Sequence, residues 1–171
     1  MVSLAAWYCL EAAFAPNVVA RVLFSETANC TPHERMLVAG VMRNRIGNRA
    51  FGNSATLLAV VQQRGAFSCI GDGNNANWRK TLHPGQMTLA ERTIWEECLA
   101  CANGNIPSAL GPSGRPLVYY HDKSIGKPAS WDNARWRAVR EVSTEHFVFY
   151  SLVPADPSRR WLPSPSPKNS K

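Results

Sequence analysis

One segment of the sequence predicts a helix that is apolar on nearly every side. Thr31, Pro32 and Glu34 supply an N-cap residue, a proline at the first helical position and a capping-box acid. An apolar run from Met36 to Met42 follows, and Gly47 ends the segment. A helix without a polar face must be covered by other elements, so we expect this one to be the buried centre of a globular domain.

The segments around this helix predict an α+β domain that is mainly α. The expected further helices cover residues 17–28, 54–63 and 88–103. Short runs of aromatic and β-branched residues predict strands at 66–70, 117–121 and 147–152. The expected fold is therefore a helical domain with a small antiparallel β element.

The length of 171 residues allows one domain with its own core, which would bury about 70% of the extended chain's surface. The five cysteines are an odd number, so we expect reduced thiols and not a complete disulfide framework. Cys98 and Cys101 lie at i and i+3 of a predicted helix with no second such pair, which favours helix packing over metal binding. Residues 72–83 lack the glycine and the glutamate of a calcium loop at its sixth and twelfth positions. No metal ion and no organic cofactor are expected.

The two ends of the chain differ from its middle. Residues 1–15 are mostly apolar but carry Glu11 and neither a basic segment nor a cleavage signal, which favours a core helix over an export signal. Residues 154–171 are rich in proline and serine and predict a basic tail, so we assign the domain to residues 1–153. No window of about 18 residues is apolar throughout, and no membrane span is expected.

The formal net charge of +7 predicts attraction to an anionic partner. Four basic residues and one acid in the tail account for +3 of this charge, which leaves +4 on the domain. Arg43, Arg45 and Arg49 do not form a recognition-helix pattern. A helical nucleic-acid-binding domain is therefore an alternative that the charge alone suggests, and nucleic acid is not the expected partner.

One acid interrupts an apolar stripe. Val19, Val22, Leu23 and Glu26 fall at positions i, i+3, i+4 and i+7 of the helix expected over residues 17–28. Burial and the negative end of the helix dipole would both raise the pKa of a carboxyl group in this place. A carboxyl group that keeps its proton near neutral pH can serve as a general acid. The alternative is an acid at the edge of the stripe that reaches solvent.

Two blocks of sequence around this acid resemble a known family. Residues 20–28 read ARVLFSETA and residues 38–46 read VAGVMRNRI. They resemble the signature of the spore-cortex-lytic, SleB-type family of cell-wall hydrolases, which is approximately A-R-x-[IL]-x-x-E-A and V-A-x-V-x-x-N-R-[VI]. Three shorter motifs follow in the order of the family: GAFSCIGDG at 65–73, VYY at 118–120 and HFVFY at 146–150. The resemblance implies a lysozyme-like fold, of the goose-lysozyme and lytic-transglycosylase type, that cleaves the glycan strands of peptidoglycan with Glu26 as the catalytic acid.

The chain departs from the family pattern next to Glu26. Cys30 stands where many members carry a second acid, and Ser25 replaces the glycine that commonly precedes the catalytic glutamate. Glu34 is close by, but its place in the predicted capping box is a sufficient structural reason for it. Glu26 is therefore the one acid to which a catalytic role is assigned.

A single carboxylate favours one mechanism over the others. Glycoside hydrolysis normally uses two carboxylates. One is sufficient where the C6 hydroxyl of muramic acid attacks C1, which gives a 1,6-anhydro product. We therefore expect lytic transglycosylation, with muramidase-type hydrolysis or a non-catalytic wall-binding module as alternatives. Asp72, in a glycine-rich turn, is the remaining candidate for a second carboxylate.

Substrate contacts are expected from aromatic and polar side chains, because sugar rings stack on flat apolar faces and their hydroxyls form hydrogen bonds. The candidates are Phe67, Ser68, Asp72, Tyr119, Tyr120, Trp131, Trp136 and His146. Each aromatic residue has a core position as its alternative, and His146 has a structural role as its alternative. The expected partner is the peptidoglycan glycan strand, bound by a monomer that acts in the periplasm or cell envelope. The missing export signal suggests a phage endolysin or virion-associated enzyme.

Overall fold

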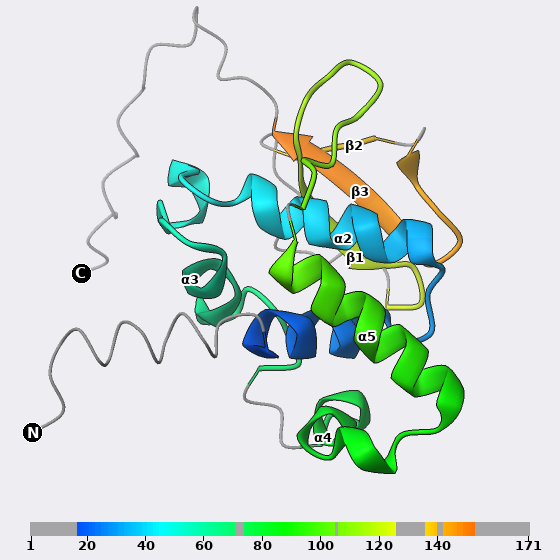
Figure 1. The fold of residues 1–171 in the computed structure, drawn as a ribbon. Coiled ribbons are helices and arrows are strands. Elements are labelled where there is room, and N and C mark those ends of the chain that lie inside the picture. Colours follow the sequence, from blue (N-terminus) through cyan, green and yellow to red (C-terminus); the bar gives the residue numbers. More distant parts are fainter. Residues whose placement is uncertain (1–16, 71–73, 105, 126–135, 140–141, 153–171) are drawn as a thin grey trace, which may run out of the picture.

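The computed structural model describes residues 17–70, 74–104, 106–125, 136–139 and 142–152 (Figure 1). A first helix covers residues 17–27. The helices that follow are α2 (Pro32–Asn44), α3 (Leu57–Gln62), α4 (Ala76–Leu82) and α5 (Leu89–Asn103), with short 3₁₀ turns η1 (Arg49–Phe51) and η2 (Pro84–Gln86). The strands are β1 (Leu117–Asp122), β2 (Trp136–Ala138) and β3 (Phe147–Leu152). The expectation of a mainly helical α+β domain is confirmed.

Helix α2 is the central helix that its sequence predicts. The Thr31 hydroxyl accepts the backbone N–H of Glu34 at 3.3 Å, and Glu34 Oε2 accepts the backbone N–H of Thr31 at 2.9 Å, which completes the capping box. Val38, Val41 and Met42 are fully buried. The helix packs against β1 on one side and against α3 and α5 on others, so its apolar faces are covered by elements from both halves of the chain.

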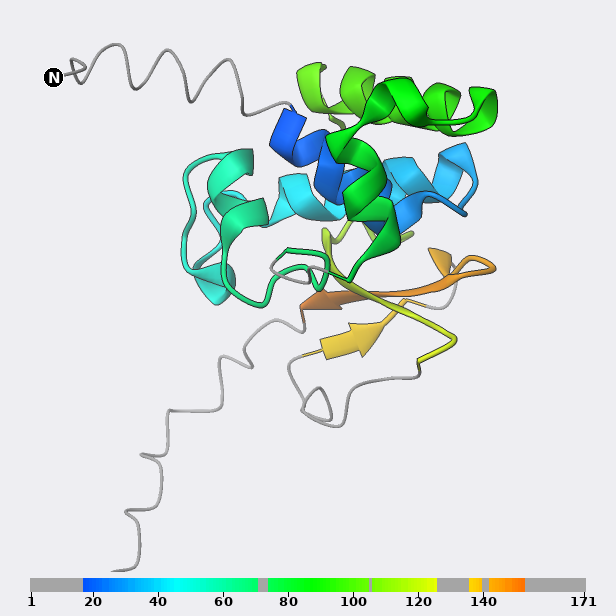
Figure 2. The ribbon, with the colours of Figure 1, turned by 90° about the horizontal axis from the view of Figure 1, so that it is seen from below.

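The three strands form one antiparallel sheet in the order β1-β3-β2 (Figure 1). In the register of β1 and β3, Leu117 lies opposite Ser151 and Asp122 opposite Phe147, with an irregularity between Leu117 and Tyr119. Figure 2 shows the sheet on one side of the helices, which gives the domain two layers. The strands expected at 117–121 and 147–152 are confirmed within one residue. Strand β2 was not expected, because three residues are too few to show an alternating pattern.

One expectation was wrong, and one helix was not predicted. Residues 66–70 form turns and not a strand: the N–H of Ala66 bonds to the carbonyl of Gln63, and that of Ile70 to the carbonyl of Phe67. The apolar run is there because Phe67 and Cys69 are buried in the core. Helix α4 was missed, although the Asn75 side chain caps it at 2.8 Å, because its sequence carries little apolar periodicity.

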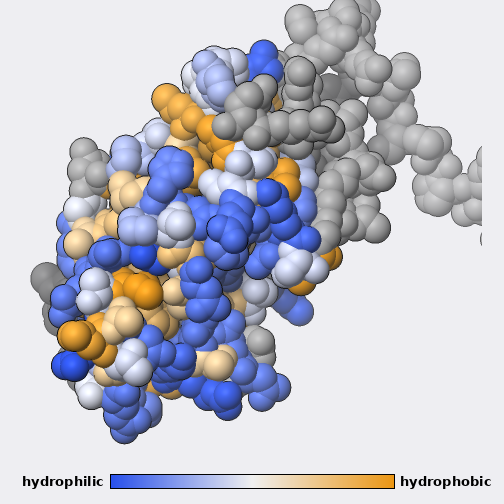
Figure 3. Space-filling model, turned by 90° about the vertical axis from the view of Figure 1, so that its right-hand side faces the viewer, coloured by the Kyte–Doolittle hydropathy of each residue, from blue (hydrophilic) through white to orange (hydrophobic). Residues whose placement is uncertain are grey.

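The core joins the first helix to α2, α5 and the sheet. Val22, Leu23 and Phe24 of the first helix are fully buried, and Phe24 makes an edge-on ring contact with Trp95 of α5 at 6.1 Å between centroids. The described cysteines Cys30, Cys69, Cys98 and Cys101 are free, and Cys98 lies in the core as a helix-packing residue. Apolar side chains that reach the surface are interrupted by hydrophilic ones on the face shown in Figure 3. Among the described helices, none is long and apolar enough to cross a membrane. Residues 1–16 and the tail after residue 152 lie outside the described residues.

Candidate active site

Glu26 occupies the last turn of the first helix. It is half-buried, while Val22 and Leu23 on the same stripe are fully buried, so the carboxylate lies where the apolar stripe reaches the surface. The Thr27 hydroxyl bonds to the carbonyl of Leu23 at 2.6 Å and closes this helix end. The helix therefore holds Glu26 on a rigid, well-packed element.

Tyr120 binds the carboxylate of Glu26 directly. The Tyr120 hydroxyl donates a hydrogen bond to Glu26 Oε2 at 3.1 Å, across 94 positions of sequence. Strand β1 carries Tyr120, and the Tyr120 ring packs edge-on against Phe147 at 5.2 Å between centroids. The sheet and the first helix thus meet at Glu26.

The buried thiol of Cys69 also interacts with this carboxylate. Burial, together with the negative charge and hydrogen bonding of Glu26, raises the pKa of the Cys69 thiol. Burial and the same carboxylate raise the pKa of Tyr120 well above its usual value. Both groups therefore keep their protons near neutral pH and serve Glu26 as neutral hydrogen-bond donors.

Arg45 supplies a positive charge to the site. Its guanidinium lies over the rings of Phe51, Phe67 and Tyr119, at 4.9, 5.2 and 4.7 Å from their centroids. Its Nε donates to the carbonyl of Val118 at 2.9 Å. Burial lowers the pKa of Arg45, and nearby Tyr120, Tyr119 and Glu26 act in the opposite direction. Since guanidinium groups stay protonated in proteins, Arg45 is a buried cation close to Glu26.

Asn44, the residue before Arg45, fixes the backbone on which this part of the site is built. Asn44 Nδ2 donates to the carbonyls of Ala109 at 2.7 Å and Leu117 at 2.8 Å, and so ties the end of α2 to the start of β1. The Asn44-Arg45 pair of the sequence motif therefore has two tasks. Asn44 fixes the backbone that leads into β1, and Arg45 packs over the ring of Tyr119 on the same strand.

One cavity of about 410 Å³ opens beside Glu26. Five of the residues predicted to form the site line it: Glu26, Phe67, Ser68, Tyr119 and Tyr120. The lining also includes residues that the sequence analysis did not select: Ser25, Arg45, Gly65, Ala66, Asn75, His121, Asp122, Ile125 and Phe147. The hydroxyl of Ser25 is buried and has no hydrogen-bond partner within the described part of the chain. The volume and the mixture of aromatic rings with polar groups suit a small-molecule or sugar ligand.

Asp122 is the most consequential of the missed residues. It follows Tyr120 by two positions on β1, so both side chains leave the strand on the same face. Its Oδ1 accepts the backbone N–H of Ser124 at 2.7 Å. An acid at the end of a strand has a structural explanation in the turn that follows, which is why its sequence position gave no signal.

The other predicted site residues are not among the described residues that line the cavity. His146 is not among the described residues that line the cavity; its ring bonds to Glu34. Asp72 and Trp131 lie outside the described residues, and only the backbone of Trp136, in β2, is described. A substrate contact by these four residues stays a prediction.

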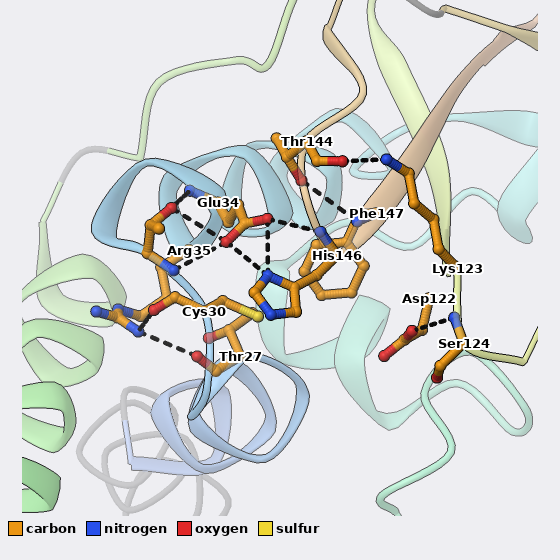
Figure 4. Close-up of polar contacts among 11 residues, drawn as sticks. Thr27, Cys30, Glu34, Arg35, Asp122, Lys123, Ser124, Thr144, His146 and Phe147 are labelled. Carbon is orange, nitrogen blue, oxygen red and sulfur yellow. Dashed lines mark hydrogen bonds and ion pairs between the residues drawn. The ribbon is translucent and has the colours of Figure 1, made fainter.

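Glu34 is the centre of a second polar cluster, shown in Figure 4. Its side chain is 2% exposed. Its Oε1 accepts the backbone N–H of His146 at 3.1 Å, and Nδ1 of the His146 ring lies 3.1 Å from both carboxylate oxygens. Burial would raise the pKa of Glu34, but hydrogen bonds from Thr144, Thr31 and His146 outweigh it and lower the pKa to about 2. The capping-box role assigned to Glu34 is confirmed, and Glu34 also fastens α2 to the residues that precede β3.

We expect acid to weaken the fold through Glu34. A folded-state pKa below that of the unfolded chain stabilises the protein above the unfolded value, and this contribution is lost as the pH falls from about 5 towards about 2. Glu34→Gln keeps a capping-box acceptor but has no charge to lose. Urea unfolding at several pH values should show a steeper acid loss in the wild type, by about 2 kcal/mol across this range. Equal slopes for the two proteins would contradict the assignment.

Comparison with known proteins gives one finding. The model of a family described as cell wall hydrolase matches residues 31–150. The match covers α2 to β3 and most of the cavity, and it begins after Glu26. No curated protein and no solved structure matches the chain.

Proposed function

Because this chain belongs to the cell wall hydrolase family, we propose that it cleaves the glycan strands of peptidoglycan in the cavity beside Glu26. The single observation that carries the proposal is the hydrogen bond of 3.1 Å between Tyr120 and Glu26 within that cavity. It holds a half-buried carboxylate at the wall of a cavity with aromatic rings for sugar stacking. The proposal includes a lysozyme-like arrangement of the helices and the sheet.

The proposed reaction is lytic transglycosylation. Protonated Glu26 donates its proton to the oxygen between N-acetylmuramic acid and N-acetylglucosamine, and the bond from C1 to that oxygen breaks. The C6 hydroxyl of the same muramic acid attacks C1 while the Glu26 carboxylate takes the hydroxyl proton. The products are a 1,6-anhydro end and a free N-acetylglucosamine end, and Glu26 is again protonated.

Each neighbour of Glu26 has a role in this scheme. Tyr120 and Cys69 donate hydrogen bonds to the carboxylate, so they stabilise the charge that forms when Glu26 gives its proton to the glycosidic oxygen. Arg45 places a buried positive charge close to the same carboxylate. Tyr119 and Phe67 are held in place by their contacts with Arg45 and leave part of their surface on the cavity.

Hydrolysis of the same bond is the second candidate, and Asp122 is the observation that favours it. A second carboxylate on the cavity could activate water or act as a nucleophile, as in two-carboxylate glycosidases. Purified sacculi digested with the full chain separate the two reactions by the masses of the muropeptides. Anhydro ends support transglycosylation, and free reducing ends support hydrolysis through Asp122. Intact glycan strands would overturn both and leave a non-catalytic wall-binding module.

Tyr120→Phe removes only the hydroxyl that binds Glu26. The edge-on contact with Phe147 remains, so the fold should be retained. We expect a fall of roughly tenfold in the turnover number with a small change in KM, because the carboxyl group is less well oriented and its charge is less stabilised after it has donated its proton. Tyr150→Phe is the control, since it also removes a buried tyrosine hydroxyl, one that contacts His121 Nδ1. Equal activity of Tyr120→Phe and the wild type would show that the bond has no role in turnover.

The proposal also includes a biological role for the chain. A role in bacteriophage lysis, or in a virion-associated enzyme that acts on the wall, is compatible with a family that degrades cell walls. It stays a prediction of the sequence.

A further inference from the structure

A second group of chemically active side chains lies next to the cavity. Cys30, Glu34 and His146 each direct one potential ligand atom to a common point, and these atoms all lie within 4.8 Å of one another. Figure 4 shows the sulfur of Cys30 pointing at one side of the His146 ring, with the Glu34 carboxylate at another. We propose that these three residues form a binding site for one Zn²⁺ ion, with a fourth position open to water.

The distances between the ligand atoms suit a tetrahedral ion. Nitrogen and oxygen ligands of zinc lie about 2.0–2.1 Å from the ion and sulfur about 2.3 Å, so neighbouring ligand atoms are roughly 3.3–3.6 Å apart. Nδ1 of His146 lies 3.1 Å from either oxygen of Glu34, close to one edge of such a tetrahedron. An ion can therefore replace the proton shared by imidazole and carboxylate after a shift of a few tenths of an ångström. The Cys30 sulfur lies within 4.8 Å of these ligand atoms and supplies the third corner after a larger movement of its side chain.

The backbone of all three residues is already fixed. The carbonyl of Cys30 accepts Arg35 Nη1 at 2.7 Å, and its N–H bonds to the carbonyl of Thr27 at 3.0 Å. Glu34 is held by the capping box, and the N–H of His146 bonds to Glu34 itself. A site on such positions loses little conformational freedom when the ion binds.

The charges at the site favour a cation. The negative charges of Glu34 and Asp122 act on the Cys30 thiol, and the positive charge of Arg35 opposes them. Arg35 is itself paired with Glu97 at 2.8 Å. Zinc displaces the proton of a thiol when it binds, so Cys30 would bind the ion as a thiolate. Two negative ligands, Cys30 and Glu34, then balance the ion.

The ligand types select zinc over harder ions. Thiolate and imidazole suit Zn²⁺, whereas Mg²⁺ and Ca²⁺ prefer sites made of oxygen atoms. The ring of His146 is 34% exposed on its side-chain surface, so the site is open to solvent from that side. Zinc would brace the N-terminus of α2 against the start of β3, beside the wall of the cavity that Phe147 provides.

Cobalt spectroscopy tests this proposal without measuring cleavage. The reduced full chain is freed of metal with a chelator and titrated with Co²⁺, whose charge-transfer band reports a thiolate ligand. We expect one equivalent to bind with that band and to be displaced by Zn²⁺. Zn²⁺ should also raise the Tm, since it binds the folded protein.

Three variants assign the ion to these side chains. Cys30→Ser should lose the band and bind Zn²⁺ at least about tenfold more weakly, and His146→Gln should keep a folded domain but bind at least about tenfold more weakly. Cys101→Ser, another half-buried free thiol, should behave as the wild type. Absence of the band in the wild type, its survival in Cys30→Ser, or full affinity in His146→Gln would overturn the site. Because the readout is metal binding, failure of the site leaves the glycan-cleaving proposal untouched.

Discussion

Glu26→Gln should abolish the digestion of purified sacculi while the domain stays folded. Glutamine keeps the size of the side chain and can still accept the hydrogen bond from Tyr120, but it has no proton to give to the glycosidic oxygen and cannot take one from the C6 hydroxyl. A group that acts as both acid and base is expected to account for a loss of roughly 10³-fold or more in turnover. Release of muropeptides, followed by mass, measures it.

The control for this variant is Glu96→Gln, an exposed acid on α5 away from the cavity. It removes the same charge and should keep full activity. Thermal unfolding of both variants checks that the loss in Glu26→Gln is chemical, with the Tm close to that of the wild type. Residual activity within tenfold of the wild type in Glu26→Gln would rule out Glu26 as the acid, and Asp122 would then be the next acid to replace.

Gly40→Ala should destabilise the domain more than a methyl group added at any other position of α2. A Cβ at residue 40 would lie 2.6 Å from the backbone nitrogen and 2.7 Å from the Cβ of Ala109. Backbone atoms cannot rotate away, so the helix or the segment before β1 must move. The overlap outweighs the gain of up to about 1 kcal/mol in helix propensity. We expect a net loss of about 2 kcal/mol or more in the free energy of unfolding.

Gly85→Ala provides the matched control, because a Cβ at residue 85 meets nothing within 4 Å. Its stability should change by no more than about 0.5 kcal/mol. Urea unfolding compares the three proteins. Activity should fall with Gly40→Ala even where the protein is folded, since Asn44 ties Ala109 to the strand that carries Tyr120. A Gly40→Ala protein as stable as Gly85→Ala would show that α2 and residue 109 are not packed as closely as described.

The elements predicted from sequence share strong local signals. Capping boxes at Thr31 and Thr88 set the starts of α2 and α5, because the side chains that satisfy the first N–H groups lie within the same turn. Strand β3 was predicted with its observed bounds, since alternating aromatic residues mark it. The strand predicted at residues 66–70 was wrong because a short apolar run is compatible with either a strand or a buried turn. Strand β2 was not predicted, because it depends on pairing with β3 alone.

The residues of the site also divide into those with a local sequence signal and those without one. Glu26 was found through its position on an apolar stripe, and Phe67, Tyr119 and Tyr120 through short motifs. Asp122 and the Cys30–Glu34–His146 cluster gave no local signal, because their members are distant in sequence: 112 positions separate Glu34 from His146. Cys98 and Cys101, whose spacing is regular, were predicted to be helix-packing residues and not metal ligands, and Cys98 lies in the core.

The sequence by itself determined that the chain makes a mainly helical domain around one apolar helix, and that an acid breaks the stripe of the first helix. Those properties follow from periodicity and capping, which act over a few residues. Only the tertiary structure decided what surrounds Glu26: the hydroxyl of Tyr120, the thiol of Cys69 and the buried charge of Arg45. Hydrogen bonds and charges act through space, so the chemistry of a carboxylate depends on groups that packing brings to it and that sequence spacing does not reveal.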